Sequence, residues 1–181
     1  KGNNAGDGYL VGMLARQLGI AVQLIAVEPK AQLSGDALTA CERALAAGIE
    51  LEEATCAIRY PVIVDALLGT GAQGMPRPAL AQAIDSINAS HGFTLSLDLP
   101  SGLNADTGEA QLAVRADATV SFIARKTGLY TGKGPAHSGQ RLFSDIGVSA
   151  DFAQGHASVP LRRWHAGLLP KVPVETYKHQ R

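Results

Sequence analysis

The sequence predicts an α/β fold: a doubly wound, mostly parallel sheet with helices on both faces. Short apolar segments rich in β-branched residues alternate along the chain with amphipathic segments of helical period. In addition, residues 62–68 are apolar at every position but one, which is typical of a strand buried on both faces of a parallel sheet. Ligands of such folds bind beyond the carboxyl ends of the strands. We therefore expect the functional residues in the loops that follow the strands.

The individual elements follow from local patterns. A helix is expected over residues 9–18, where apolar residues recur at helical spacing and Gly19 can end the helix. After a strand at 22–27, Ser34 is predicted to cap a helix that runs to residue 47. Further strands are expected at 62–68, 94–99, 118–124 and 141–145, with a helix around residues 80–87.

Composition narrows the class of protein. The 181 residues are 46% hydrophobic and 18% charged, which suffices for one core and is too apolar for a disordered chain. Sixteen basic and sixteen acidic residues give a net charge of zero, so no overall field attracts nucleic acid or an anionic membrane. No apolar run reaches the length of a membrane span. Cys41 and Cys56 form no CxxC pair, and we expect free thiols in a globular, cytoplasmic protein.

The first loop that can carry chemistry is KGNNAGDG, at residues 1–8, directly before the first expected helix. Its glycines allow close approach of the backbone to a ligand, and amides at a helix N-terminus attract phosphate. The alternative is a turn that only caps the helix, with Asp7 as a favourable N-terminal charge.

The second loop, residues 64–75, follows the apolar strand. Asp65 is predicted to lie inside that strand, where a carboxylate is costly unless it is paired or bound to a cation. Gly69, Thr70 and Gly71 then offer a second backbone cradle for a ligand. The alternative is a tight turn that Asp65 caps.

The third loop, residues 97–108, begins where Asp98 closes a strand and Pro-Ser-Gly turns the chain. A carboxylate at this edge of the sheet is a candidate general acid or base, and its alternative is a turn aspartate. No Ser-His-Asp arrangement is readable, because Ser101 lacks a GxSxG context.

Taken together, GNNAGDG, VDALLGTG, LDLPSGLNADTG and TVSFIARKTGLYTGKG, in this order, resemble the YjeF N-terminal domain family, the NAD(P)H-hydrate (NAD(P)HX) epimerases. The resemblance covers about residues 1–148. It implies a Rossmann-like fold and interconversion of the R and S epimers of NADHX and NADPHX, the hydrated, damaged forms of the reduced nicotinamide cofactors. It also implies a potassium ion in the site and a homo-oligomer, without a nucleic-acid or membrane partner.

The resemblance carries site residues over by position. Asp98 is expected to be the catalytic proton carrier, and Lys126 to contact phosphate or substrate unless it is a surface lysine. Potassium is expected on Asn4, Asp65 and Ser101. Substrate contacts are expected from two segments and Asp98: Asn3, Asn4, Ala5, Gly6 and Asp7, then Gly69, Thr70, Gly71, Ala72, Gln73, Gly74 and Met75.

The resemblance to this family also predicts the domain organisation. Residues 1–150 correspond to the epimerase domain without its N-terminal portion, because the sequence begins inside the first motif. Residues 151–181 are expected to be a linker that ends in the opening of an ADP-dependent NAD(P)HX dehydratase domain, which would make the full-length protein a bifunctional repair enzyme. The alternative function is a non-catalytic nucleotide- or partner-binding module of the same fold.

Overall fold

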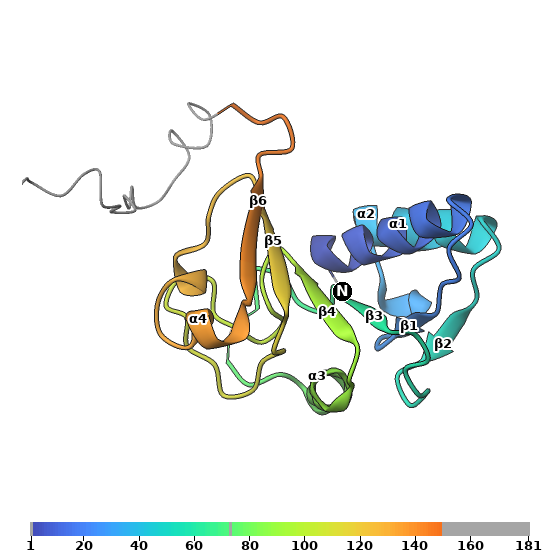
Figure 1. The fold of residues 1–181 in the computed structure, drawn as a ribbon. Helices are drawn as coiled ribbons and strands as arrows, with labels where there is room; N and C mark the ends of the chain where they lie inside the picture. Colours follow the sequence, from blue (N-terminus) through green and yellow to red (C-terminus); the bar gives the residue numbers. More distant parts are fainter. Residues whose placement is uncertain (1, 73, 150–181) are drawn as a thin grey trace, which may run out of the picture.

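The computed structural model describes residues 2–72 and 74–149, which form two parallel sheets flanked by helices (Figure 1). The α/β class predicted from the sequence is therefore confirmed. In chain order the elements are α1 Asn3–Gln17, β1 Leu24–Ala26, η1 Lys30–Gln32, α2 Gly35–Ala46, β2 Leu51–Glu53, β3 Val62–Asp65, α3 Pro78–Ala89, β4 Phe93–Leu97, β5 Ala118–Phe122, η2 Thr127–Leu129, α4 Gly134–His137 and β6 Gln140–Ser144.

The larger sheet has the order β3-β4-β5-β6, and every neighbouring pair is parallel. All four strands therefore point their carboxyl ends at one edge, where the loops after β3, β4 and β5 meet. The smaller sheet is a parallel pair, β1-β2. In the part of the chain described, no strand joins β1 to β3, so the single sheet expected from the sequence is interrupted between them.

Helix α1 begins at Asn3, six residues before the start expected from apolar periodicity. The segment predicted as a glycine-rich loop is thus the first two turns of the helix. Its glycines serve close packing: a Cβ on Gly6 would lie 3.4 Å from Cα of Ala37 in α2, and one on Gly8 would lie 2.6 Å from Cβ of Ala66. The helix consequently approaches both α2 and the end of β3 closely.

Strand β3 ends at Asp65, three residues before the predicted end. The Leu67 amide donates to Oδ1 of Asp65 at 3.3 Å, and this local hydrogen bond turns the chain out of the strand. Asp65 therefore lies at the strand's carboxyl end and not within it. The other predicted strands and helices after residue 20 are present with ends shifted by a few residues, although the Ser34 side chain makes no capping hydrogen bond.

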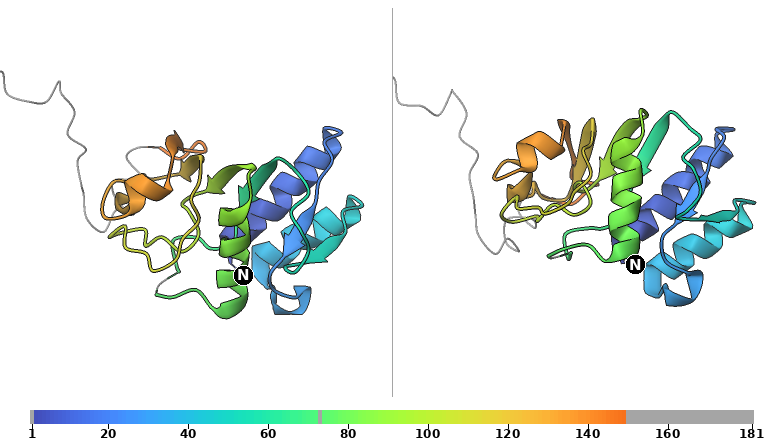
Figure 2. Two further views of the ribbon diagram at one scale, coloured as in Figure 1. Left: turned by 60° about the horizontal axis from the view of Figure 1, so that its bottom comes forward. Right: turned by 90° about the horizontal axis from the view of Figure 1, so that it is seen from below.

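Three apolar clusters hold these elements. In Figures 1 and 2, α1 and α2 lie side by side, and their core includes Tyr9, Met13 and Cys41. Ile84 and Ile87 of α3 pack with Ile63 of β3. A third cluster, around Leu99, Leu103 and Leu129, fixes the long loop between β4 and β5.

Cys41 and Cys56 are free thiols, as expected. Of the helices described, none is long and apolar enough to cross a membrane. The predicted linker and second-domain opening, residues 151–181, lie outside the described residues.

The α3 cluster gives a stability prediction. Ile84 is fully buried, so Ile84→Ala should lower the free energy of unfolding by about 2–5 kcal/mol through lost contacts and a residual cavity. The exposed Gln82→Ala on the same helix should change it by less than about 0.5 kcal/mol. Urea denaturation measures both, and equal effects would contradict this packing.

Candidate active site

A fully buried carboxylate, that of Asp65, lies beneath the carboxyl edge of the larger sheet. The Ser96 hydroxyl on β4 donates to Oδ2 at 2.7 Å, and the Ser101 backbone amide donates to the same atom at 2.9 Å. The Ser101 hydroxyl donates to Oδ1 at 2.5 Å. Strand β3 is thereby tied to its neighbour and to the Pro-Ser-Gly turn.

These hydrogen-bond donors compensate the cost of burying the Asp65 charge, for which the sequence alone identified no partner. Burial raises the pKa of Asp65, whereas the hydrogen bonds from Ser101, Ser96 and Leu67 lower it. Because side-chain and backbone donors already satisfy both carboxylate oxygens, the buried charge does not by itself require a cation.

Asn4 connects α1 to this hydrogen-bonded group. Its Nδ2 donates to the Leu68 carbonyl at 2.9 Å, and the Leu68 amide donates to Oγ of Ser101 at 2.9 Å. The three residues expected to hold potassium, Asn4, Asp65 and Ser101, are thus joined by hydrogen bonds through the backbone of one residue, Leu68. Asn4 is 8% exposed, and its Oδ1 is buried without a hydrogen-bond partner among the described residues.

The Oδ1 atom of Asn4, buried without a hydrogen-bond donor, is therefore available as a ligand for a cation. Amide, carboxylate and hydroxyl oxygens suit a hard cation, so the three side chains fit the expected ion. Among the described residues, no group of three or more His, Cys, Asp or Glu side chains could hold a metal.

Above this group lies a cavity of about 1090 Å³. It is lined by a stripe of α1 that includes Asn3, Asp7 and Leu10, and by Asp98 and Lys126 from beyond β4 and β5. Ten of the residues predicted for the site line it: Asn3, Asn4, Gly6, Asp7, Gly69, Thr70, Gly71, Ala72, Asp98 and Lys126.

Asp98 occupies a strained corner of this cavity. Its φ of 68° is left-handed, which is uncommon for a residue other than glycine. Its amide donates to the Val120 carbonyl at 2.7 Å, and its Oδ1 accepts the Phe122 amide at 3.1 Å. Backbone bonds to β5 therefore fix the carboxylate's direction.

The charged partner of Asp98 is Lys126. Its Nζ forms an ion pair with Oδ1 of Asp98 and donates to the Phe122 carbonyl at 2.7 Å. The two side chains are 15% and 18% exposed, so Lys126 is not a freely solvated surface lysine. The pair leaves Oδ2 of Asp98 without a hydrogen-bond donor in the described part of the chain.

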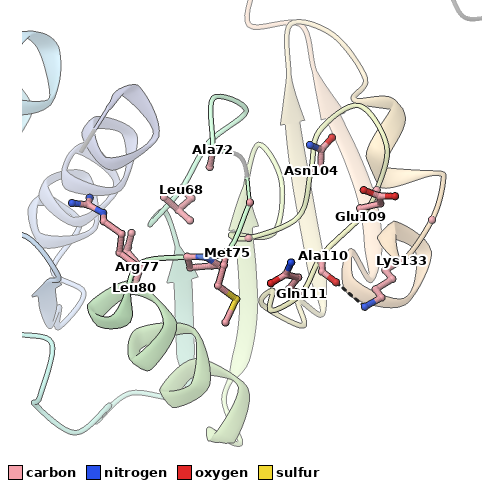
Figure 3. Close-up of a pocket in the computed structure, with 15 residues that line it drawn as sticks. Leu68, Ala72, Met75, Arg77, Leu80, Asn104, Glu109, Ala110, Gln111 and Lys133 are labelled. Carbon is pink, nitrogen blue, oxygen red and sulfur yellow. Dashed lines mark hydrogen bonds between the residues drawn. The ribbon is translucent and has the colours of Figure 1, made fainter.

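The glycine turn after β3 divides its residues between two cavities. The Ala72 amide donates to the Gly69 carbonyl at 3.1 Å, which makes a tight turn at the rim of the large cavity. Gly74 and Met75 instead line a smaller cavity of about 560 Å³, between Leu68 and Asn104 in Figure 3. Ala5 lines neither cavity, and Gln73 lies outside the described residues.

Sequence reasoning missed two contributors to the site. Ser96 pairs in register with Asp65, so both side chains lie on one face of the sheet. Strand alternation, with a serine among apolar neighbours, could have found it. The Phe122 backbone holds both Asp98 and Lys126, and no side-chain pattern signals that role.

Comparison with known proteins places this geometry in a family. The family model described as "YjeF-related protein N-terminus" matches residues 1–128. The chain belongs to the YjeF N-terminal family. The site residues above, from Asn3 to Lys126, all fall within the matched segment of this YjeF N-terminal domain.

The chain is also similar in sequence to individual proteins with names from this family. The chain is 44% identical over 184 residues to the bifunctional NAD(P)H-hydrate repair enzyme Nnr of Escherichia coli K12, covering 96% of this chain and 35% of that protein. It is 37% identical over 155 residues to the NAD(P)H-hydrate epimerase of Rhodopirellula baltica, covering 82% of this chain and 64% of that one. The chain thus spans about a third of the bifunctional relative.

A solved structure supports the fold of this YjeF N-terminal domain. The crystal structure of the yeast protein YNL200c has a TM-score of 0.67, with 91% of this chain and 71% of that chain covered. Its sequence identity is 16%, so it shows the fold alone.

The group around Asp65 gives a second prediction. Ser101→Ala removes a donor to a buried carboxylate and the acceptor of the Leu68 amide, and should lower the free energy of unfolding by about 1.5–3 kcal/mol. The exposed Ser86→Ala serves as the control in the same thermal or urea melts. Indistinguishable melts would mean that this hydrogen-bonded group does not stabilise the fold.

Proposed function

We propose that this domain is an NAD(P)H-hydrate epimerase, an isomerase that interconverts the R and S forms of NADHX and NADPHX. One observation carries the proposal: the Asp98–Lys126 pair lines the same cavity as Asn4, the member of the Asn4–Asp65–Ser101 group that reaches it. Two relatives of the same family carry the repair or epimerase activity in their names.

The cavity suits a dinucleotide. Its volume of about 1090 Å³ slightly exceeds the usual range of ligand pockets, roughly 300–1,000 Å³, so it can take a large ligand. At its rim the first amides of α1, beginning at Asn3, have no partner within the helix and carry its positive dipole end. Such amides bind diphosphate, so the polar centre of the substrate is expected beside Asn3 and the Gly69 turn.

Asp98 is the residue expected to move a proton. The hydrated carbon of the substrate is a hemiaminal, so loss of water, assisted by the ring nitrogen, gives a planar iminium that water can attack from either face. The fixed Oδ1 and the free Oδ2 of Asp98 allow it to accept a proton from that water. Lys126 holds the carboxylate in place.

Potassium is part of the proposal. Oδ1 of Asn4, the Asp65 carboxylate and Oγ of Ser101 would hold the ion. When bound, it would supply positive charge beside the expected diphosphate. The residues themselves already join α1 to the turn after β3, so they orient this edge of the cavity with or without it.

A second catalytic domain is also proposed. The relatives named bifunctional extend well beyond the segment that this chain matches, which supports a fused ADP-dependent dehydratase in the full-length protein. Assembly into a homo-oligomer and a cytoplasmic location remain predictions from the sequence.

Replacing the proton carrier tests the reaction. Asp98→Asn keeps the shape of the side chain and should lower the rate of NADHX epimerisation by about 10²- to 10⁴-fold. The rate is measured by chromatography of the two epimers, starting from one of them. Asp85→Asn, exposed on α3, should leave the rate unchanged. Tight nucleotide binding by the wild type without epimerisation would instead favour the non-catalytic module.

Thermal melts test the ion. In potassium chloride the melting temperature should exceed that in choline chloride at equal ionic strength, because an ion that binds only the folded state stabilises it. Asn4→Ala should abolish the increment, whereas Asn88→Ala, on α3, should lower stability and keep the increment. An increment of the same size in Asn4→Ala would remove Asn4 from the ion site.

A further inference from the structure

Asp7 is a charged side chain in the large cavity that the reaction described above does not use. It lies on the stripe of α1 formed by Asn3, Asp7, Leu10 and Leu14, whose three- and four-residue spacing places them on one helix face. Unlike Asp98, its carboxyl group has no hydrogen-bond or ion-pair partner among the described residues. The described residues therefore give this carboxyl group no internal partner.

Asp7 and Asp98 approach the cavity from different elements. Asp7 comes from the second turn of α1, and Asp98 from the strained corner after β4, so a ligand in the cavity would meet carboxyl groups from two separate elements. Among the described residues, the other charged groups that line this cavity are Asp36, at the start of α2, and Lys126.

The surroundings of the two carboxyl groups differ. Asp98 pairs with the Lys126 ammonium group and accepts a hydrogen bond from the Phe122 amide, whereas Asp7 has no such partner among the described residues. Burial, and then the negative charge of Asp98, raise the pKa of Asp7. Two carboxyl groups with such different environments can divide the roles of acid and base between them.

Such a division would assist both halves of the epimerisation of a hemiaminal. The hydroxyl group must leave from one face of the ring as water, and a new water must add to the other face. A single carboxyl group on one side can serve only one of these faces without moving.

We propose, on the basis of the epimerase function above, that Asp7 is a second catalytic residue that acts on the ring face opposite to Asp98. In one direction Asp7 donates its proton to the hydroxyl oxygen, the C–O bond breaks with the electrons staying on oxygen, and the ring-nitrogen lone pair forms the iminium. A second water then attacks the other face while Asp98 takes its proton. One water leaves, one enters, and one proton has passed from Asp7 to Asp98, to be returned through solvent.

The reverse direction exchanges the roles, as microscopic reversibility requires. Asp98 then donates to the departing hydroxyl and Asp7 accepts the proton of the incoming water. Each inversion replaces the substrate hydroxyl oxygen with an oxygen from solvent.

The test compares Asp7→Asn, Asp7→Glu and the control Asp85→Asn in the full chain, with NADHX as the probe. Asp7→Asn should lower kcat by about 10²- to 10⁴-fold, while the Kd measured with NADH should change by less than about threefold. Asp7→Glu should recover part of kcat. In ¹⁸O-labelled water the wild type should incorporate one label for each inversion, and Asp7→Asn should slow inversion and labelling together.

The pH profile separates chemistry from positioning. For the direction in which Asp7 is the acid, the wild-type kcat should fall as pH rises through the pKa of Asp7, and this limb should vanish in Asp7→Asn. An unchanged kcat in Asp7→Asn, or a loss confined to KM, would overturn the proposal for Asp7. A wild type that does not epimerise NADHX would instead overturn the proposed function, whatever Asp7 does.

Discussion

The buried Asp65 carboxylate is the constraint on which the rest of the site depends. A charge without access to water is tolerated only when donors surround it, and here they come from β4, from the Pro-Ser-Gly turn and from the chain's own exit from β3. Satisfying this one group fixes where the turn after β3 starts. That turn presents the Leu68 carbonyl to Asn4, and Asn4 anchors the beginning of α1. The walls of the large cavity are thus positioned by a polar group beneath its floor.

A second constraint acts at the Asp98 corner. The left-handed backbone of Asp98 is matched by that of Ile123, with φ of 63°, at the end of the neighbouring strand. Unfavourable backbone conformations persist only where surrounding bonds hold them, and the amide of Phe122 and the ammonium of Lys126 do so here. Both strained residues line the cavity, so the strain coincides with the proposed chemistry.

Much of this could be predicted from the sequence, for physical reasons that also explain the errors. Apolar periodicity and β-branched content identified the strands, because a strand that is buried on both faces is apolar at nearly every position. The carboxyl edge of a parallel sheet then brought Asp98 and the Gly69 turn together. The start of α1 was missed because Gly6 and Gly8 are typical of loops, whereas here they permit contact with α2 and β3. The donors around Asp65, and the use of Phe122, depend on register and backbone contacts, which no single-residue pattern encodes.

One feature of the fold bears on how the molecule responds to a bound dinucleotide. The β1-β2 pair and the four-stranded sheet share no strand hydrogen bonds in the described residues, and the Arg77–Glu28 ion pair is one of the side-chain links between them. The large cavity spans this seam, with α1 on one flank and the loops after β4 and β5 on the other. A ligand lying across it would act as a non-covalent cross-link, so that two units with separate cores would unfold together instead of one after the other.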